Sequence, residues 1–249
     1  MSSGKVFLIG AGPGDIELLT LKAVRCLQQL DIALIDDLVN PDIASLLPAG
    51  CEIVPVGKRG GCQSARQSDI EARLLAEARA GRRVGRIKGG DPFIFGRGGE
   101  EMQTLHAAGI TVEVINGLTA ALAVPATLGI PLTHRAHVHG VTLVSGHTHQ
   151  GDEPNWHQLA RSGTTLVIYM GMSRLAHICQ QLQAAGMDTA TPAAAIQHGT
   201  LPQQRQVVGT LASLPALVEA AALGSPALLV IGPTVALADP KHSVIKESA

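Results

Sequence analysis

Short runs of apolar residues alternate along the chain with stretches whose apolar residues recur at helical spacing. Over residues 69–80, for example, Ile70, Leu74 and Ala78 fall on one face of a helix. The pattern predicts strands over residues 6–9, 32–35, 52–56, 83–87, 112–115, 141–144, 165–169, 192–196, 206–208 and 227–231, and helices over 19–30, 69–80, 99–108, 175–185 and 213–222. Because this alternation is typical of helices that cover a largely parallel sheet, we predict an α/β fold.

A break in the alternation predicts two domains. Residues 130–139 include Pro131 and follow neither pattern, so we expect a linker there. The predicted organisation is an N-terminal α/β domain over residues 1–130, a C-terminal α/β domain over 131–240 and a flexible tail over 241–249. Two consecutive α/β domains predict a cleft between them, and ligands of open α/β sheets bind outside the carboxyl ends of the strands.

The composition is rich in glycine and poor in aromatic residues. The 249 residues include 28 Gly and 14 Pro but one Trp, one Tyr and three Phe. We therefore expect an aliphatic core, with the glycines in turns or where the backbone approaches a ligand. The 19 Lys and Arg residues nearly balance the 20 Asp and Glu residues, so the net charge provides no general attraction to nucleic acid or anionic membranes.

The sequence predicts a cytoplasmic protein. The first residues lack a basic region followed by an apolar one, and the apolar stretch over residues 220–238 is interrupted by Pro226 and Pro233. The four cysteines form no CxxC pair, which excludes the commonest zinc and redox motifs. Free thiols are typical of a reducing compartment.

The first predicted strand runs into the glycine-rich turn GAGPGD over residues 10–15. A dinucleotide-binding turn has the spacing GxGxxG, which places its third glycine where this chain has Asp15. A carboxylate there would repel a pyrophosphate, so the turn favours a neutral or cationic ligand and argues against a nicotinamide-dependent dehydrogenase. A tight turn without a ligand is the alternative.

The fourth predicted strand leads into the loop KGGDPFIFGRGGEE over residues 88–101. A loop so rich in glycine loses much conformational entropy on ordering, so a bare connector explains it poorly. Basic residues gather around this loop, and such a cluster favours a ligand with several carboxylates. They are Arg79, Arg82, Arg83, Arg86, Lys88 and Arg97. Some of these should be solvated charges at helix ends, but Arg86, Lys88 and Arg97 flank the glycines. With Lys58 and Arg59 after the third strand and Arg135 in the linker, these three are the candidates to bind such a ligand.

Two ionisable residues, Asp36 and Lys58, follow the second and third predicted strands. A carboxylate and an amine that face one cleft can divide proton removal and proton donation between them. An ordinary salt bridge is the alternative.

Histidines form two HxH pairs, His137/His139 and His147/His149. On a strand this spacing places both rings on one face, as metal ligands require. No neighbouring cysteine or carboxylate pattern completes such a site, so we expect no metal centre.

These motifs, in this order, resemble the tetrapyrrole methylase family. The resemblance runs from residue 6 to about residue 235. It includes GAGPGD (10–15), DDLV (36–39), VGKR (56–59), KGGDPFIFGRGGEE (88–101), GIPLTHR (129–135), SGH (145–147) and YMG (169–171), of which the GGDPFIFGRGG segment is the most specific.

The resemblance implies two α/β domains, S-adenosylmethionine in the cleft between them, and a homodimer. The VGKR, GRGGEE and GIPLTHR segments resemble the family members that act on uroporphyrinogen III. This implies two successive C-methylations, to precorrin-1 and then precorrin-2, for siroheme or cobalamin biosynthesis, with S-adenosylhomocysteine as the other product. A methylase of a later precorrin and a tetrapyrrole or metal carrier are the alternatives.

The resemblance also implies roles for individual residues. Asp36 would be the proton acceptor and Lys58 the proton donor. Because uroporphyrinogen carries many carboxylates, we assign Arg86, Arg97 and Arg135 to them. The implied cofactor-binding positions are Pro13, Gly89, Gly90, Asp91, Ile94, Thr119, Ala120, Met170 and Gly199.

At a few positions the chain departs from the family's usual residues. Ile35 stands where the family often has Tyr, Gly85 where a strand Val is usual, Asn116 where Pro is common, and Thr127-Leu128 where Tyr is frequent. No proposed catalytic group is lost at these positions, so we expect the departures to affect the shape of the pocket and not the residues that transfer protons.

Overall fold

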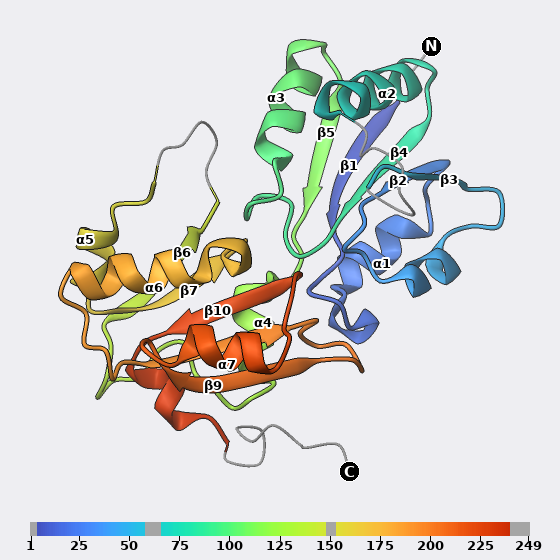
Figure 1. The fold of residues 1–249 in the computed structure, drawn as a ribbon. Helices are drawn as coiled ribbons and strands as arrows, with labels where there is room; N and C mark the ends of the chain where they lie inside the picture. The colour runs from blue at the N-terminus through green and yellow to red at the C-terminus, as the bar shows by residue number, and fades with distance from the viewer. Residues whose placement is uncertain (1–3, 58–65, 148–152, 240–249) are drawn as a thin grey trace. The chain divides into compact units, whose positions relative to one another are not determined.

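The computed structural model describes residues 4–57, 66–147 and 153–239, and within them the chain forms two five-stranded sheets (Figure 1). Each predicted strand is present, to within a few residues at its ends. The strands are β1 (Lys5–Gly10), β2 (Ile32–Ile35), β3 (Glu52–Pro55), β4 (Arg83–Lys88), β5 (Thr111–Ile115), β6 (Gly140–Ser145), β7 (Thr164–Tyr169), β8 (Pro192–Gln197), β9 (Arg205–Thr210) and β10 (Ala227–Ile231). The α-helices are α1 (Leu21–Leu27), α2 (Gln67–Arg79), α3 (Gly98–Ala107), α4 (Ala120–Ala126), α5 (Trp156–Ala160), α6 (Leu175–Ala184) and α7 (Leu214–Ala220).

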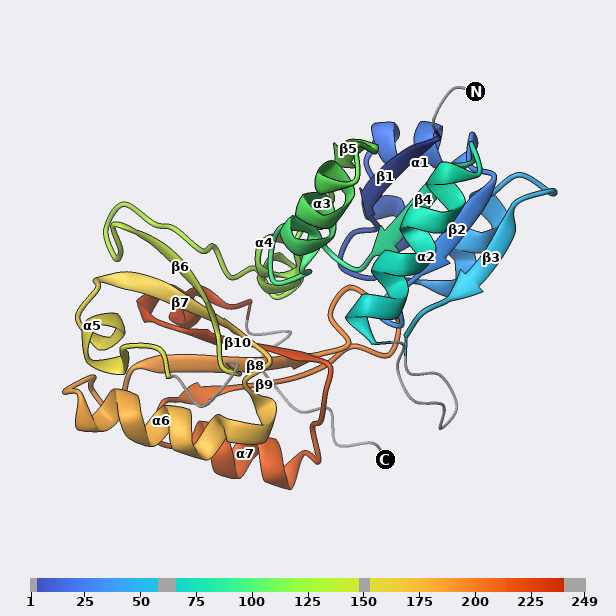
Figure 2. The same ribbon diagram turned by 90° about the horizontal axis from the view of Figure 1, so that it is seen from above.

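The first sheet is parallel throughout and has the strand order β3-β2-β4-β1-β5. Helix α1 covers one face, where Ala23 and Leu27 join the cluster that contains Ile9 of β1. Helices α2 and α3 cover the other face, where Leu74 and Leu105 are fully buried (Figure 2). Since parallel strands all end at the same edge, the loops after β1, β2, β4 and β5 are gathered there.

The second sheet has the order β6-β7-β10-β8-β9 and is mixed. Only the β6–β7 pair is parallel, whereas β10 runs antiparallel to both β7 and β8, and β8 antiparallel to β9. The prediction of a largely parallel sheet is therefore wrong for this half of the chain. Residues 198–204, which join β8 to β9, are too few for a crossover helix, so the two strands must return as a hairpin.

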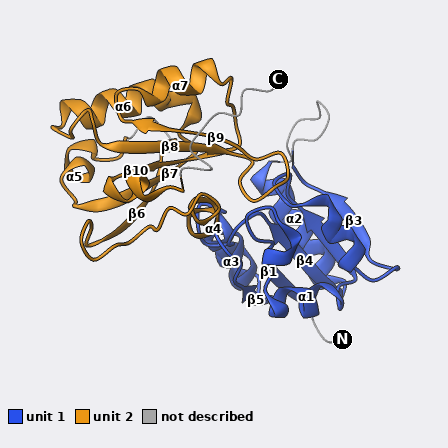
Figure 3. Cartoon of the chain, turned by 90° about the horizontal axis from the view of Figure 1, so that it is seen from below, with its two compact units in different colours: residues 1–119 blue, residues 120–249 orange. Residues whose placement is uncertain are grey.

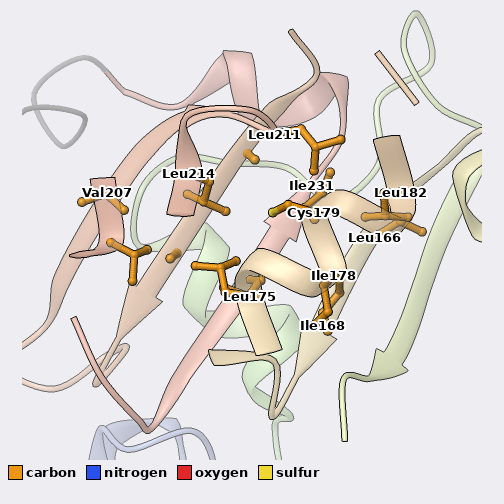
Figure 4. Packing of buried hydrophobic residues seen from close by; sticks show 14 of the residues in the cluster. Leu166, Ile168, Leu175, Ile178, Cys179, Leu182, Val207, Leu211, Leu214 and Ile231 are labelled. Carbon is orange, nitrogen blue, oxygen red and sulfur yellow. The ribbon is translucent and has the colours of Figure 1, made fainter. Parts of the chain in front are cut away.

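Aliphatic side chains fill the core of the second half, as the composition predicts. On one face, α6 places Leu175, Ile178 and Leu182 against Leu166 and Ile168 of β7 (Figure 4). The other face is covered by α4 and by the segment that follows β10. Neither α4 nor α5 was predicted: α4 contains Pro125, which is unusual inside a helix, and α5 has five residues, too few to show a helical repeat.

Two compact units divide the chain, Met1–Thr119 and Ala120–Ala249 (Figure 3). The boundary between the units follows residue 119, eleven residues before the boundary that was expected after residue 130. The reason is that Ala121, Val124 and Ile130 belong to the apolar cluster on the second sheet, so α4 folds with that sheet. The expected tail over residues 241–249 lies outside the described residues.

The apolar stretch over residues 220–238 holds β10, of which four residues are buried. Among the described helices, none has the length and apolar character needed to cross a membrane.

Candidate functional site

Three glycine loops meet by backbone contact at the carboxyl edge of the first sheet. A Cβ on Gly10 would lie 2.4 Å from the nitrogen of Gly117, and one on Gly117 would lie 2.2 Å from the carbonyl oxygen of Gly90. Gly12 and Gly90 exchange backbone hydrogen bonds of 3.2 and 2.7 Å. These glycines are therefore required first for the close packing of one loop on another, and any side chain there would separate the loops.

Asp91 fastens two of these loops together. Its carboxylate accepts hydrogen bonds from the backbone nitrogen of Phe93 (2.9 Å), from Asn116 Nδ2 (3.2 Å) and from the backbone nitrogen of Gly117 (3.2 Å). The side chain of Asn116, where a proline is common in the family, thus contributes a bond that proline cannot make. The cofactor-binding role of Asp91 and of its neighbours Gly89 and Gly90 stays a prediction.

The loop between Asp91 and α3 holds strained backbone. Phe95 and Arg97 have φ of 53° and 59°, a region that residues with a side chain rarely adopt. The backbone must turn so sharply that a Cβ on Gly96 or Gly98 would collide with the carbonyl oxygen of Pro92 at 2.8 and 2.5 Å. Phe93 and Phe95 in this loop are exposed, unlike the aliphatic core.

The first glycine turn also differs from a phosphate-binding turn. Asp15 accepts a 2.9 Å hydrogen bond from the backbone nitrogen of Glu17 and caps a short 3₁₀ helix. Asn40 Nδ2 donates to the carbonyl oxygen of Gly14 (2.8 Å), so the loop after β2 holds this turn, which includes Pro13. The carboxylate of Asp15 thus lies at the turn where an anionic ligand would need a positive or neutral group.

A buried charge network lies between β4 and α3. Arg86 and Lys88 from β4 and Glu101 from α3 have side chains that are at most 3% exposed. Arg86 Nε donates to Glu101 Oε1 (3.0 Å), Lys88 Nζ lies 3.2 Å from both Glu101 oxygens, and Arg86 Nη2 donates to Asp36 Oδ2 (3.1 Å). Desolvation lowers the pKa of Lys88, with the charge of Arg86 as the second cause.

Of the two predicted acid/base residues, Asp36 and Lys58, the structure describes Asp36. Asp36 directly follows β2, as expected, and its side chain is 36% exposed. Lys58 and Arg59 lie outside the described residues. Gly57 packs against Asp37, the residue after Asp36. A Cβ on Gly57 would lie 2.3 Å from Asp37 Cγ.

Of the three arginines assigned to substrate carboxylates, two are exposed and one is buried. Arg97 begins α3 and pairs on the surface with Glu100, with 3.1 Å between Nε and Oε1. Arg135 is exposed in the segment over residues 130–139, which has no helix or strand. Arg86 instead donates to groups of its own unit.

In the second unit, the other predicted cofactor residues lie around α4. Tyr169 Oη accepts a 2.8 Å hydrogen bond from the nitrogen of Ala121, which ties the end of β7 and Met170 to the turn that starts at Ala120. A Cβ on Gly199 would lie 2.4 Å from Val124 Cγ1, so the loop after β8 also touches this helix.

The two loops around α4 contain left-handed residues other than glycine. Met170, His198 and Thr200 have φ of 54°, 49° and 69°. Gln204 Oε1 accepts a 2.7 Å bond from the nitrogen of Thr200, and Gln204 Nε2 donates to Thr127 Oγ1 (2.9 Å). The threonine that departs from the family pattern thus supports the strained loop.

The histidine pairs are described in part, since His149 lies outside the described residues. Among the residues that the structure describes, no three His, Cys, Asp or Glu side chains are arranged to hold a metal ion. His134 and His137 have ring centroids 4.7 Å apart.

A family comparison identifies the chain. The model of the tetrapyrrole (corrin/porphyrin) methylases matches residues 5–215. The chain belongs to this family.

Known relatives of this tetrapyrrole methylase cover nearly its whole length. It is 54% identical over 230 residues to a uroporphyrinogen-III C-methyltransferase of Pseudomonas aeruginosa, which covers 92% of this chain and 94% of that protein. It is 50% identical to siroheme synthase 2 of Aeromonas hydrophila over 94% of this chain, and it spans about half the length of that protein.

The fold of the tetrapyrrole methylase matches a solved structure as well. Uroporphyrin-III C-methyl transferase from Thermus thermophilus, complexed with S-adenyl homocysteine, has a TM-score of 0.82 and 41% identity, and the match covers 94% of this chain and 100% of the other.

Several residues of the tetrapyrrole methylase site were not predicted to have a role. Glu101 lies in a quoted motif, yet only its place on the face of α3 that buries Leu105 signals that this carboxylate faces inward. Gln67 donates to Glu101 Oε1 (3.2 Å), a partner 34 residues away that a local pattern does not reveal. Gln204 binds both Thr200, four residues before it, and the distant Thr127.

Proposed function

We propose that the protein is an S-adenosylmethionine-dependent methyltransferase that converts uroporphyrinogen III to precorrin-2 by two successive C-methylations, through precorrin-1. The observation that carries the proposal is the 54% identity to the Pseudomonas aeruginosa uroporphyrinogen-III C-methyltransferase over nearly the full length of both chains. The Thermus thermophilus structure with S-adenyl homocysteine supports the choice of cofactor.

The charges at the carboxyl edge of the first sheet fit this cofactor, which carries a sulfonium and no phosphate. Arg86 and Lys88 are neutralised by Glu101 and Asp36, and Asp15 presents a carboxylate at the first glycine turn. Bound S-adenosylmethionine supplies a methyl group activated by the positive sulfur. We assign its binding to Pro13, Gly89, Gly90, Asp91 and Ile94 in the first unit, and to Thr119, Ala120, Met170 and Gly199 around the start of α4 and the loops that contact it.

The protein's own residues handle the protons and the substrate. Once a pyrrole carbon has gained a methyl group, the carbon framework must lose a proton, and we assign its acceptance to the carboxylate of Asp36. Lys58 is the proposed proton donor. Arg97 and Arg135, both exposed, are the proposed contacts for substrate carboxylates, because a guanidinium binds a carboxylate with two parallel hydrogen bonds.

The proposal includes a homodimer in the cytoplasm, acting in siroheme or cobalamin biosynthesis. Family membership supports the dimer. The thiols of Cys26, Cys51 and Cys179, which are free, support a reducing compartment.

Incubation of the purified protein with S-adenosylmethionine and uroporphyrinogen III tests the activity. Mass spectrometry should detect a product that has gained two methyl groups. A product without an added methyl group would overturn the proposal, and methylation of precorrin-2 in place of uroporphyrinogen III would establish the later-precorrin alternative.

Two variants test the assigned roles. Asp36→Asn should slow turnover strongly while calorimetry shows unchanged affinity for S-adenosylhomocysteine, and Asp42→Asn, an exposed acid nearby in sequence, is the control. Lost cofactor affinity in Asp36→Asn would make Asp36 a binding residue. Arg97→Ala should raise the substrate KM with little effect on cofactor affinity, and the reverse pattern would contradict its assignment.

A further inference from the structure

We propose that Arg86 is a positioning residue, whose buried guanidinium holds the carboxylate of Asp36 in one orientation. Glu101 and Lys88 hold Arg86 in turn. The inference rests on the proposed function, in which Asp36 accepts the proton.

All three nitrogens of the Arg86 guanidinium donate to the protein. Nη2 binds Asp36 Oδ2 (3.1 Å), Nε binds Glu101 Oε1 (3.0 Å) and Nη1 binds the carbonyl oxygen of Ile87 (3.3 Å). The side chain is 3% exposed. A residue placed in this way is poorly available to a substrate carboxylate, but it fixes one oxygen of Asp36 relative to the sheet.

Glu101 anchors the far side of the guanidinium. It is fully buried and accepts hydrogen bonds from Arg86, Lys88 and Gln67. Two cations and two carboxylates are thereby balanced, which a buried ionic cluster requires. Asp36 is the member of the four that reaches the surface, with 36% of its side chain exposed, so the network ends on the group that must meet the substrate.

The backbone of Asp36 is fixed from the same strand. Its nitrogen donates to the carbonyl oxygen of Ile87 (3.1 Å), and β4 is paired on both sides, with β1 and β2. Side chain and main chain of the proton acceptor are therefore both held by β4. Such preorganisation spares the reaction the cost of ordering the base.

The charged groups that face Asp36 in the described residues are few. Arg86 and Lys88 come from β4, Glu101 stands behind Arg86 on α3, and Asp37 follows in the chain; Lys58 lies outside the described residues. Arg86 is the group that donates a hydrogen bond to the Asp36 carboxylate, so removal of Arg86 should leave that carboxylate without a fixed orientation and slow the proton transfer.

The variant Arg86→Gln suits the test, since Lys88 and Glu101 remain as a buried ion pair whose charges cancel. Arg86→Lys keeps the charge but lacks the planar fork that reaches both carboxylates. Arg83→Gln is the matched control, an arginine on the same strand whose side chain is 53% exposed and pairs with Asp31 at the surface.

Initial rates would be measured with uroporphyrinogen III and S-adenosylmethionine, together with calorimetry of S-adenosylhomocysteine binding. In Arg86→Gln we expect kcat to fall about tenfold or more, since a general base contributes at least that much. KM and cofactor affinity should stay near those of the wild type. Arg86→Lys, which keeps the charge, should lose less of kcat than Arg86→Gln, and Arg83→Gln should change nothing.

The outcomes separate the two proposals. A raised KM with unchanged kcat would make Arg86 a substrate contact and overturn the positioning role. A fall in kcat with an equal loss of cofactor affinity would show a structural role alone. If Arg86→Gln does not fold, Arg86→Lys decides by the same split between kcat and KM. A wild-type protein that forms no methylated product would contradict the proposed function, whereas an active wild type with an unchanged kcat in Arg86→Gln contradicts this inference only.

Discussion

The side chain of Leu30 fills the space beside Gly85 in β4. A Cβ built on Gly85 would lie 2.3 Å from Leu30 Cδ1, closer than real contacts allow, and Leu30 itself is 2% exposed. The glycine that replaces the family's usual strand valine is therefore matched by a leucine from the segment after α1.

Substitutions at these two positions should be coupled. Gly85→Val should lower the free energy of unfolding by about 1–3 kcal/mol through overpacking, and Leu30→Ala by about 2–5 kcal/mol through a cavity. In the double variant the valine occupies part of that cavity, so urea denaturation should give a loss smaller than the sum by about 1 kcal/mol or more. Additive losses would mean that the two side chains do not compete for one space.

Two neighbouring glutamates on α3 should differ sharply in their effect on stability. Glu101→Gln leaves Arg86 and Lys88 buried without their shared carboxylate, and should cost about 3–5 kcal/mol of unfolding free energy. Glu100→Gln removes an exposed pair with Arg97 and should cost less than about 1 kcal/mol. Denaturant unfolding measures both, and equal losses would contradict the buried network.

Because Asp91 holds two loops together by three hydrogen bonds, we expect substitutions of Asp91 and Asn116 to lower stability by different amounts. Asp91→Ala leaves two partly buried backbone donors and the amide of Asn116 without an acceptor, and should lower the free energy of unfolding by roughly 2–4 kcal/mol. Asn116→Ala removes one of the three bonds and should cost about 1 kcal/mol. Hydrogen exchange at Phe93 and Gly117 should quicken in Asp91→Ala, and unchanged protection would show that the carboxylate does not hold these loops.

Acid stability should depend on Glu153. Hydrogen bonds from His177, Arg174 and Trp156 lower the pKa of Glu153 from its ordinary 4.5 to about 2. Because the folded pKa lies below the unfolded one, this carboxylate contributes stability that is fully present above about pH 4.5 and is lost as the pH falls towards 2.

Denaturation of the wild type and of Glu153→Gln at a series of pH values checks this. The difference in their stability should shrink as the pH falls below 4.5. Glu219→Gln, at an exposed position on α7, is the control, and its difference from the wild type should stay flat. A constant difference for Glu153→Gln would rule out the shifted carboxylate.

Much of the fold could be predicted because it depends on local patterns. A buried strand such as β10 reads as an unbroken apolar run, and α2 shows its buried face at helical spacing. The antiparallel pairing in the second sheet could not be predicted in this way. An apolar run does not show which strand will be its neighbour, or whether the two will run parallel or antiparallel. Helix α4 was missed because Pro125 lies inside it, where proline usually ends a helix.

By itself, the sequence determined the alternating α/β architecture, the position of each strand, the family and the loops in which Asp36 and the glycines stand. Only the tertiary structure decided what those residues contact. Arg86 and Arg97 both belong to one basic cluster in the sequence, yet one is buried against Glu101 and Asp36 and the other is exposed beside Glu100. The physical reason is that the role of a charge depends on the solvent and partners around it, and these come from segments far apart along the chain.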